Sequence, residues 1–554
     1  MCFSQIFNML SRCSWVAVGT LLLTLGIMSL TYSFNLLLGG VAYYISIYPS
    51  VHILLMELGW LIDFQSLCFC GCVMLISGSV VVYSQDYMMS EKFLNRFLMI
   101  LMSFILSMVV LIFSDNMLQV ILGWDGLGLS SYLLVCYYNN SNSSNAGGLT
   151  LMVNRMGDGG LFIVMFYFIL SSHQVHVFMS NSMCVGLMLF LVCCTKSAQV
   201  PFSAWLPTAM AAPTPASSLV HSSTLVTAGV YLMIRFHTSL MSISWLSLLV
   251  GVLTSLTATL CALVEKHMKK IVALSTLSHL GIMVTILSYG WVDMSFSHLI
   301  FHAFFKATLF LVVGFWIHSQ SGYQDLKNIS SASLKDPQVS CFGGLAMMSL
   351  CGLPYLTGFY SKDIFMEILL YQGGGVLMMV FMFFGMMGSF MYSFRMFKSI
   401  NNSSNMGVLV LLEEDPKCYK LSLLVLSCLS IFGGYMVSCY WVLEESVLYV
   451  FWEMKLIVLV MILTSFLVVM KSKMNSYFLS DLGYMSSLSR MAPNLSGYSL
   501  SLNVNLFDKN FLNPYSGGSY QMSASLVAPD VLSLNFFSMM KLLFLLMFLL
   551  VSIS

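Results

Sequence analysis

Charged side chains are scarce in this sequence: lysine, arginine, aspartate and glutamate together make up 8% of its 554 residues. In a water-soluble domain about a quarter of the residues are charged, so the composition excludes a soluble globular protein of this size. The formal net charge is +1, which excludes the strong positive field of nucleic-acid-binding proteins. The 58% of hydrophobic residues suits a lipid bilayer as the surrounding solvent.

Sequence signatures of redox and metal cofactors are also missing. The 15 cysteines have neither the spacing of a disulfide framework nor that of an iron–sulfur cluster, and no glycine-rich dinucleotide loop follows a strand. In the one dense group, Cys68 and Cys72 share a helix face, Cys70 lies on another, and no fourth metal ligand is near in sequence. We therefore expect these thiols to pack as small hydrophobic groups, and we expect this chain to bind no metal and no cofactor.

Long apolar runs dominate what is present. A helix needs about 20 apolar residues to cross the hydrocarbon core, and fifteen runs fit that requirement. The sequence therefore predicts an all-α, polytopic membrane protein of about fifteen to sixteen transmembrane helices. The predicted spans are Trp15–Leu38, Phe64–Gln85, Phe97–Ser114, Asn116–Tyr138, Thr150–Ser172, Ser182–Val200, Leu206–Ile234, Thr238–Val264, Ile271–Gly290, Met294–His318, Ser340–Leu370, Gly375–Phe397, Leu421–Leu443, Ser446–Met470 and Val531–Ile553.

Prolines interrupt two of these runs, within Gln199–Pro215 and within Gly352–Gly358. Proline removes a backbone donor and clashes with the preceding turn, and in lipid such breaks survive only where protein or a wet cavity satisfies the freed groups. A lysine accompanies each break, Lys196 before the first and Lys362 after the second. Interrupted helices in two corresponding halves are typical of transporters built from inverted repeats, so we predict two such repeats here.

On this pattern the chain divides into three regions. Residues 1–114 are predicted to form an N-terminal transmembrane region, residues 115–397 a core with both repeats, and residues 398–554 a C-terminal region. The last region is predicted to hold two helices, an interfacial connector over 471–530 and a final transmembrane helix. Because prolines and glycines interrupt the connector, we expect only part of it to be helical.

Several ionisable residues lie inside the apolar runs. A charged side chain at the bilayer centre costs about 2.5–3.5 kcal/mol on insertion scales. One buried histidine is more often an ordinary core residue than a proton carrier, and the i, i+3 spacing of Arg155 and Asp158 also fits a structural ion pair. Lysines that alternate with histidines and acids across several spans instead favour a proton relay, in which buried groups pass protons to one another. The residues concerned are Asp125, Asp158, Lys196, His221, His298, His302, Lys306, Lys362, Asp363 and Glu367.

A buried lysine can act as a switchable proton site. Burial disfavours the charged form of a lysine, a neighbouring carboxylate favours that form, and histidine passes protons between such sites. His298, His302 and Lys306 recur at i, i+4 and i+8, which places them on one helix face. For the first lysine we hypothesise an acidic partner, with Asp125 and Lys196 paired across two helices.

Eight segments carry a family resemblance, and three of them are short: Trp-Leu-Pro at 205–207, Pro-Thr-Pro at 213–215 and His-Ser-Ser-Thr at 221–224. Residues 123–131 read Gly-Trp-Asp-Gly-Leu-Gly-Leu-Ser-Ser, residues 154–158 read Asn-Arg-Met-Gly-Asp, and residues 196–202 read Lys-Ser-Ala-Gln-Val-Pro-Phe. Residues 302–307 read His-Ala-Phe-Phe-Lys-Ala and residues 358–363 read Gly-Phe-Tyr-Ser-Lys-Asp. These motifs resemble those of the chain 5 family of mitochondrial NADH–ubiquinone oxidoreductase, the distal antiporter-like subunits of respiratory complex I.

The resemblance implies a membrane subunit that translocates protons while other subunits pass electrons from NADH to ubiquinone. It implies that this chain holds no redox cofactor, because NADH, FMN, the iron–sulfur clusters and ubiquinone are bound elsewhere in the complex. It also implies the mitochondrial inner membrane, contacts with lipids, and partners among the other membrane-arm subunits, especially the neighbouring antiporter-like subunit. By motif match, the relay residues are Asp125, Lys196, His221, Lys306 and Lys362, with His302, Asp158 and Asp363 in support.

The sequence departs from the family pattern at four positions. Asp125 stands where a glutamate is usual, which shortens the reach toward Lys196 by one methylene group. Ser203 stands in place of a histidine, Ala211 in place of an acid, and Lys327 in place of an arginine. The first three departures bear on how protons are taken up or coupled.

Two other functions stay open on the sequence. Subunits of multi-subunit cation/proton antiporters share the core motifs, so the chain could belong to such a transporter. A third possibility is a subunit that mainly anchors the membrane arm and moves few protons. The spelling of residues 358–363, the methionine-rich composition and a single last span favour complex I.

Overall fold

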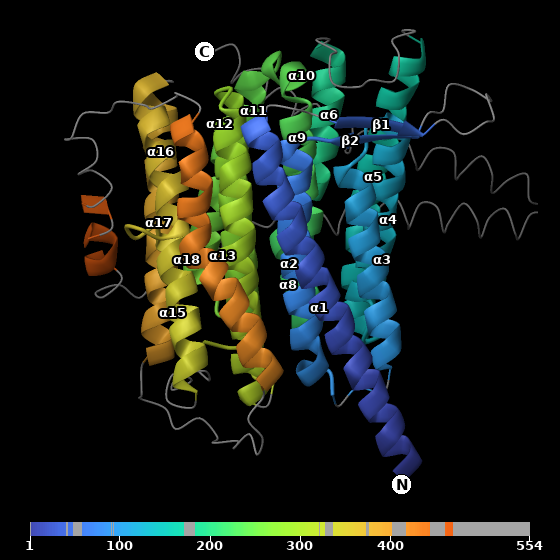
Figure 1. The fold of residues 1–554 in the computed structure, drawn as a ribbon. Coiled ribbons are helices and arrows are strands. Elements are labelled where there is room, and N and C mark those ends of the chain that lie inside the picture. The colour runs from blue at the N-terminus through green and yellow to red at the C-terminus, as the bar shows by residue number, and fades with distance from the viewer. Residues whose placement is uncertain are drawn as a thin grey trace, which may run out of the picture. The chain divides into compact units, whose positions relative to one another are not determined.

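The structure is a computed structural model, and it describes residues 2–39, 43–47, 58–89, 91, 93–170, 183–320, 322–326, 336–372, 376–401, 417–443, 460–461 and 463–468. All of them belong to one compact unit, residues 1–485. Its long helices run beside one another in Figure 1. In chain order they are α1 (Cys2–Gly39), α2 (Phe64–Tyr87), α3 (Leu94–Ile112), α4 (Met117–Val135), α5 (Ser141–Leu170), α6 (Met183–Lys196), α11 (Ser244–Val264), α12 (Met268–Ser288), α13 (Val292–Ser319), α15 (Pro337–Cys351), α16 (Thr357–Gln372), α17 (Val376–Asn401) and α18 (Lys417–Leu443).

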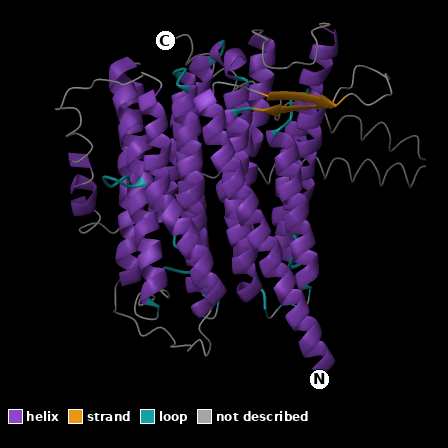
Figure 2. Ribbon diagram, viewed as in Figure 1, coloured by secondary structure: helices purple, strands orange, loops and turns teal. Residues whose placement is uncertain are grey.

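The all-α prediction is confirmed except for one small hairpin. Strands β1 (Tyr43–Ile47) and β2 (Leu58–Ile62) pair in antiparallel register, with Tyr43 opposite Ile62, and are drawn in orange in Figure 2. The amide of Leu61 donates to the carbonyl of Phe113 at 3.0 Å, so the hairpin is attached to the end of α3. Aromatic and β-branched residues favour strands, but so short a run gave no separate signal inside an apolar sequence.

Within the described residues, eleven helices are long and apolar enough to cross a membrane. Four predicted spans account for the difference from fifteen. The run Ser182–Val200 forms the shorter helix α6, and Ser340–Leu370 is divided into α15 and α16. Only residues 460–461 and 463–468 of the predicted span Ser446–Met470 are described, and these are helical. Val531–Ile553 and the connector 471–530 lie outside the described residues.

Three segments each contain an apolar stretch that is completely buried, and they form the centre of the bundle: α12, α13, and residues Thr214–Arg235. α13 packs against α2, α12, α15, α16 and α18. The α11–α12 packing is close because Gly251 and Gly281 face each other, and a Cβ built on Gly281 would lie 2.8 Å from the carbonyl oxygen of Gly251. A side chain at either position would push the two helices apart.

The first predicted break is present. After α6 the chain makes a turn, a short helix α7 (Trp205–Thr208), a 3-10 turn η2 (Ala209–Ala211) and the helix α8 (Thr214–Leu219). A π-helical turn η3 (Val220–Thr224) follows, then α9 (Leu225–Arg235) and α10 (His237–Met241). The Trp205 indole donates to the Thr195 carbonyl at 2.9 Å, so protein satisfies a carbonyl at the interrupted end of α6, as the membrane environment requires.

The second predicted break is also present, between α15 and α16. Gly352 ends α15 with φ +74°, a conformation in which a side chain would be strained. Leu353 to Leu356 then connect to α16, which begins at Thr357. Both breaks therefore lie where the prolines placed them.

Two boundaries were predicted wrongly. The polar stretch 139–145 was assigned to a connection, but α5 already begins at Ser141, and the Ser143 hydroxyl accepts a hydrogen bond from the Asn140 amide at 2.9 Å. Polar residues can continue a helix beyond the membrane, so hydropathy alone placed its start too late. The long span predicted from Leu206 begins eight residues later, at Thr214, because the prolines keep 201–213 in short turns.

Candidate functional site

Lys196 ends α6 at the first break and is completely buried. Its Nζ donates to the carbonyl of Trp124 in α4 at 2.6 Å and lies 3.8 Å from the centre of that indole ring. A cation at the last turn of a helix is favoured by the helix dipole, and a cation over an indole face is favoured by the ring quadrupole. The charged form of Lys196 is therefore supported by neutral groups on two helices.

Two carboxylates, those of Asp158 and Asp125, are close enough to Lys196 to attract its charge. Arg155 of α5 contacts Asp158 at 3.1 Å and Asp125 of α4 at 3.9 Å. The side chains of Arg155 and Asp125 are 45% and 30% exposed on the surface of this chain, whereas that of Asp158 is 9% exposed. We define the first-half cluster as Trp124, Asp125, Arg155, Asp158 and Lys196.

The hypothesised ion pair between Asp125 and Lys196 does not form in the structure. Asp125 is oriented toward Arg155, and Lys196 donates to the Trp124 carbonyl instead. An aspartate reaches one methylene group less far than a glutamate, which leaves the carboxylate of Asp125 short of Lys196. The predicted pair Arg155–Asp158 does form.

His221 lies in the π-helical turn η3, buried to 1% exposure. Neither of its ring nitrogens has a hydrogen-bond partner among the described residues, and its ring lies 6.1 Å from that of Trp205. π-Helical turns inside α-helices are frequent at functional sites. The sequence predicted the residue as functional but held no signal for the turn.

The second half brings α13 against α12. His298, His302 and Lys306 are all buried at 0–1% exposure, on one face as their spacing predicted. Lys306 Nζ donates to the Ser275 hydroxyl of α12 at 2.5 Å. His302 lies with its ring centre 5.6 Å from that of His279, and its own nitrogens have no partner among the described residues.

His279 of α12 is a member of this group that sequence reasoning missed. It is completely buried, and its Nδ1 lies 3.1 Å from Nε2 of His298. His298 Nδ1 in turn lies 2.8 Å from the Ser361 hydroxyl. The available signal was a lone histidine in the apolar run Ile271–Gly290, which taken singly reads as a core residue.

Lys362 of α16 completes the group. It is 2% exposed, donates to the Leu350 carbonyl of α15 and to the Ser389 hydroxyl of α17, the latter at 3.2 Å, and lies 5.2 Å from the ring centre of Phe390. Asp363, the next residue, is partly buried. We define the second-half cluster as Ser275, His279, His298, His302, Lys306, Ser361 and Lys362.

Arg395 lies on α17 and caps the end of a neighbouring helix. Its guanidinium donates to the carbonyls of Ala262 and Leu263 and to that of Glu265 at 2.6 Å. These carbonyls end α11, where no further intrahelical donor is available. Arg395 thus acts as a C-cap, and it lies outside both clusters.

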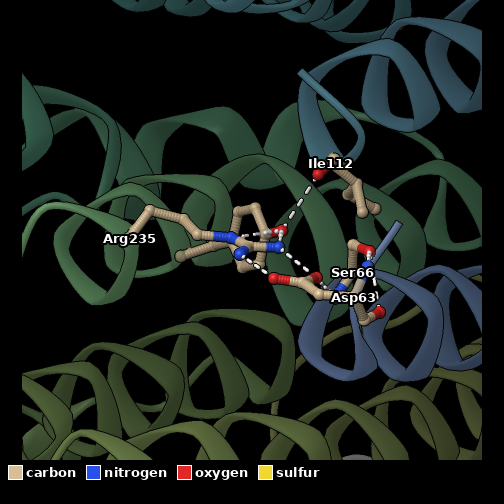
Figure 3. A network of polar contacts seen from close by, with 5 residues as sticks. Asp63, Ser66, Ile112 and Arg235 are labelled. Atoms are coloured by element: carbon tan, nitrogen blue, oxygen red, sulfur yellow. Dashed lines mark hydrogen bonds and ion pairs between the residues drawn. The ribbon is translucent and has the colours of Figure 1, made fainter. Parts of the chain in front are cut away.

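A second charged group missed from the sequence joins the ends of α2, α3 and α9 (Figure 3). Arg235 forms a two-bonded ion pair with Asp63, with N–O distances of 2.5 and 2.8 Å, and also binds the Tyr231 hydroxyl. That hydroxyl donates to the Ile112 carbonyl at 3.0 Å, and Asp63 caps α2 together with Ser66. Burial alone would raise the pKa of Asp63, but the hydrogen bond and charge of Arg235 lower it below its usual value.

The cysteine group pointed out by the sequence lies within α2, with Cys68, Cys70 and Cys72 all buried. Among the residues that the structure describes, no group of three or more His, Cys, Asp or Glu side chains is placed to hold a metal ion. The thiols contact the hydrophobic core, as expected for small buried groups.

Comparison with known families places these features in context. Residues 114–388 match the family described as "NADH:quinone oxidoreductase/Mrp antiporter, TM", and residues 48–98 match "NADH-Ubiquinone oxidoreductase (complex I), chain 5 N-terminus". Both clusters lie in the first of these matches. Asp63 lies in the second.

A solved structure shares the fold. It is the "Structure of Mrp complex" from a Dietzia species, which aligns with a TM-score of 0.76 and 21% sequence identity. The alignment covers 96% of this chain, which spans 63% of the length of that one. At this identity the likeness shows the fold alone.

Curated relatives are more similar in sequence. The NADH-ubiquinone oxidoreductase chain 5 of Locusta migratoria is 43% identical over 396 residues, 68% of each chain. That of Anopheles gambiae is 43% identical over 412 residues, which cover 72% of this chain and 71% of the relative. With identities this high over more than two thirds of both proteins, the chain belongs to the NADH-ubiquinone oxidoreductase chain 5 family and is a multi-pass membrane protein.

Proposed function

We propose that this chain translocates protons along a row of buried basic side chains, as a membrane subunit of NADH–ubiquinone oxidoreductase. The observation that carries the proposal is the burial of Lys196, Lys306 and Lys362, each at most 2% exposed. Placing ionisable groups inside a membrane protein is costly, and they usually mark ion or proton pathways. Direct hydrogen bonds to carboxylates do not explain them, because the three ammonium groups donate to carbonyls and hydroxyls.

The proposed relay has two ends of different chemistry. In the first-half cluster, carboxylates beside Lys196 supply proton acceptors, and in the second-half cluster histidines lie beside Lys306. His221 lies in the π-helical turn η3, after the first break. Both of its ring nitrogens are buried and have no hydrogen-bond partner among the described residues. The members we assign are Asp125, Asp158, Lys196, His221, His302, Lys306, Lys362 and Asp363.

The wider setting is part of the proposal. Electrons would pass from NADH through FMN and iron–sulfur clusters to ubiquinone in other subunits, while this chain binds none of these cofactors. Its partners would be membrane lipids and the other membrane-arm subunits, especially a neighbouring antiporter-like subunit, in the mitochondrial inner membrane. Residues 115–397 would form the translocating core between the regions 1–114 and 398–554.

The alternative function is that of a subunit in a multi-subunit cation/proton antiporter. The likeness to the Mrp complex at a TM-score of 0.76 favours it, because an antiporter needs the same kind of buried relay. The two functions differ in their driving force. The alternative predicts proton movement that depends on a cation gradient and proceeds without NADH.

The test uses the assembled complex in sealed lipid vesicles, with protons translocated per NADH oxidised as the measurement. Lys196→Met and Lys362→Met keep the side-chain volume but remove the proton site, so we expect loss of proton yield while NADH oxidation persists. Lys266→Met is the matched control, because Lys266 is exposed in the loop between α11 and α12.

Each outcome separates the candidates. An unchanged proton yield in assembled Lys196→Met and Lys362→Met complexes would assign the chain a mainly anchoring role. Proton movement driven by sodium or potassium gradients without NADH would favour the antiporter function.

A further inference from the structure

His279 lies deep in α12, where this helix packs against α13, and it is completely buried. We propose that His279 is a proton-carrying member of the relay, which passes protons through His298 and Ser361 to the Lys362 end of the second-half cluster. This inference rests on the proposed function and adds a residue and a direction of connection to it.

The first support is an unbroken pair of hydrogen bonds across three helices. Nδ1 of His279 in α12 lies 3.1 Å from Nε2 of His298 in α13, and Nδ1 of His298 lies 2.8 Å from the Ser361 hydroxyl in α16. The two imidazole rings are stacked with centres 5.3 Å apart. Every bond in this row joins groups that both donate and accept, which proton transfer along a row requires.

The second support is the open end of the row. Nε2 of His279 is buried and has no hydrogen-bond partner among the described residues. A buried polar atom without a partner is unfavourable, so a purely structural role would leave this nitrogen unexplained. The ring centre of His302 lies 5.6 Å from that of His279, and both of its nitrogens also have no hydrogen-bond partner among the described residues, so a second titratable group is close to this end of the row.

The third support is the placement of the lysines at either side. Lys306 donates to Ser275, one turn before His279 on α12. Lys362 follows Ser361 directly in α16. The charges of Lys306 and Lys362 both act on His279, so this histidine lies within electrostatic reach of both lysines.

The proton balance of the row is simple. A proton binds Nε2 of His279, and the N–H bond at its Nδ1 breaks as a new one forms at Nε2 of His298. The N–H bond at Nδ1 of His298 then breaks as its proton passes to the Ser361 oxygen, and the original hydroxyl proton of Ser361 passes to the Nζ of Lys362, which accepts it in its uncharged amine form. One proton enters and one leaves. Both rings end neutral in the opposite tautomer, so the row must be reset before it conducts again in the same direction.

The variant that isolates this role is His279→Asn. An asparagine amide places a polar atom near the position of Nδ1 and can keep the hydrogen bond to His298, but it does not bind and release protons in this range. In the reconstituted complex we expect His279→Asn to assemble, to oxidise NADH, and to lose proton yield per NADH. A merely structural histidine would be replaced by asparagine without that loss.

His318→Gln serves as the control, because His318 lies in the last turn of α13, the helix that carries His298, and is exposed. If the complex with His279→Asn does not assemble, His279→Gln is measured in its place. The number of protons translocated per NADH by that variant then tests the role of His279. A wild-type yield in whichever variant assembles, together with a loss in Lys362→Met, would overturn the role of His279 and leave the proposed function standing. A wild-type yield in both would overturn the two together.

Discussion

Lys196 in the first half and Lys306 in the second are both fully buried, yet they have different neighbours. Asp158 and Asp125 attract Lys196, while Arg155 repels it. The charged group that acts on Lys306 is Lys362, which repels it. The first-half cluster thus balances two cations with two anions, whereas the second-half cluster combines two lysines with neutral histidines and hydroxyls.

This difference gives the two buried lysines electrostatically different surroundings. Where carboxylates are near, the charge on a lysine is supported by opposite charge. Where only hydroxyls, carbonyls and imidazoles are near, two protons on neighbouring lysines oppose each other, so occupancy of one site disfavours occupancy of the other. Stability measurements on matched variants test this contrast directly.

The largest effect is expected at the first lysine. Lys196→Met leaves Asp125 and Asp158 with Arg155 as their single cation and removes the donor to the Trp124 carbonyl, so it should destabilise by about 3 kcal/mol, as when one partner of a buried charge group is removed. Lys362→Met removes a repulsion and should leave stability unchanged or higher. The measurement is the midpoint temperature of thermal unfolding of the detergent-solubilised complex, and equal losses in both variants would contradict the contrast.

A slightly smaller effect is expected at the ion pair of Figure 3, which provides a reference that is structural and distant from both clusters. Asp63→Asn should lower stability by about 2 kcal/mol, because Arg235 keeps its burial and loses its charge partner. Proton yield per NADH should stay at the wild-type value. A loss of yield at full assembly would mean that this pair belongs to the relay.

The same aspartate gives a pH dependence. The folded-state pKa of Asp63 is lower than its usual 3.8, so its stabilising contribution is present well above that value and is lost as the pH falls through the lower folded-state pKa. Asp63→Asn should therefore flatten the acid end of the unfolding profile. An unchanged acid limb would show that another group controls it.

A modest effect is expected at the cation shared by the two acids. The Arg155 side chain is 45% exposed in this chain, so Arg155→Gln should cost about 1 kcal/mol, near the upper limit for an exposed pair. The informative comparison is the double variant with Lys196→Met. Because both cations neutralise the same two carboxylates, their combined cost should exceed the sum of the single costs, and simple additivity would argue against a shared cluster.

The smallest effect is expected at the exposed pair of His267 and Asp325, which join at 2.9 Å with side chains 46% and 50% exposed. Asp325→Asn should change stability by less than about 1 kcal/mol and should leave proton yield unaltered. Any larger change would indicate that the backbone bonds between these two loops depend on the side-chain pair.

Much of the fold follows from local chemistry and was predictable. The length of the apolar runs located the long helices, and the prolines located both breaks. Both signals are local, because they determine the structure of the segment that contains them. The i, i+4, i+8 set of α13 was predictable for the same reason. The start of α5 at Ser141 and the hairpin before Asp63 were not, since polar helix ends and short strands carry little hydropathy signal.

The site was predictable in its members but less so in its contacts. Lysines within apolar runs stand out, whereas the partner of Lys196 depends on which acceptor on α4 lies nearest, a matter of tertiary distance. His279 was missed because one histidine in one apolar run has no periodicity, and its meaning appears only when α13 places His298 beside it. The π-helical turn at His221 likewise depends on packing rather than on local sequence.

The regular spacing on α13 has a consequence for the permitted length of this helix. Each residue turns an α-helix by about 100°, so a single insertion between His298 and Lys306 would rotate one of them away from α12 while leaving every side chain chemically intact. An insertion after Ser319, beyond the helix, would rotate neither. Insertion and deletion tolerance should therefore be lowest across these nine positions, and the number of residues there is as much a part of the machinery as their identity.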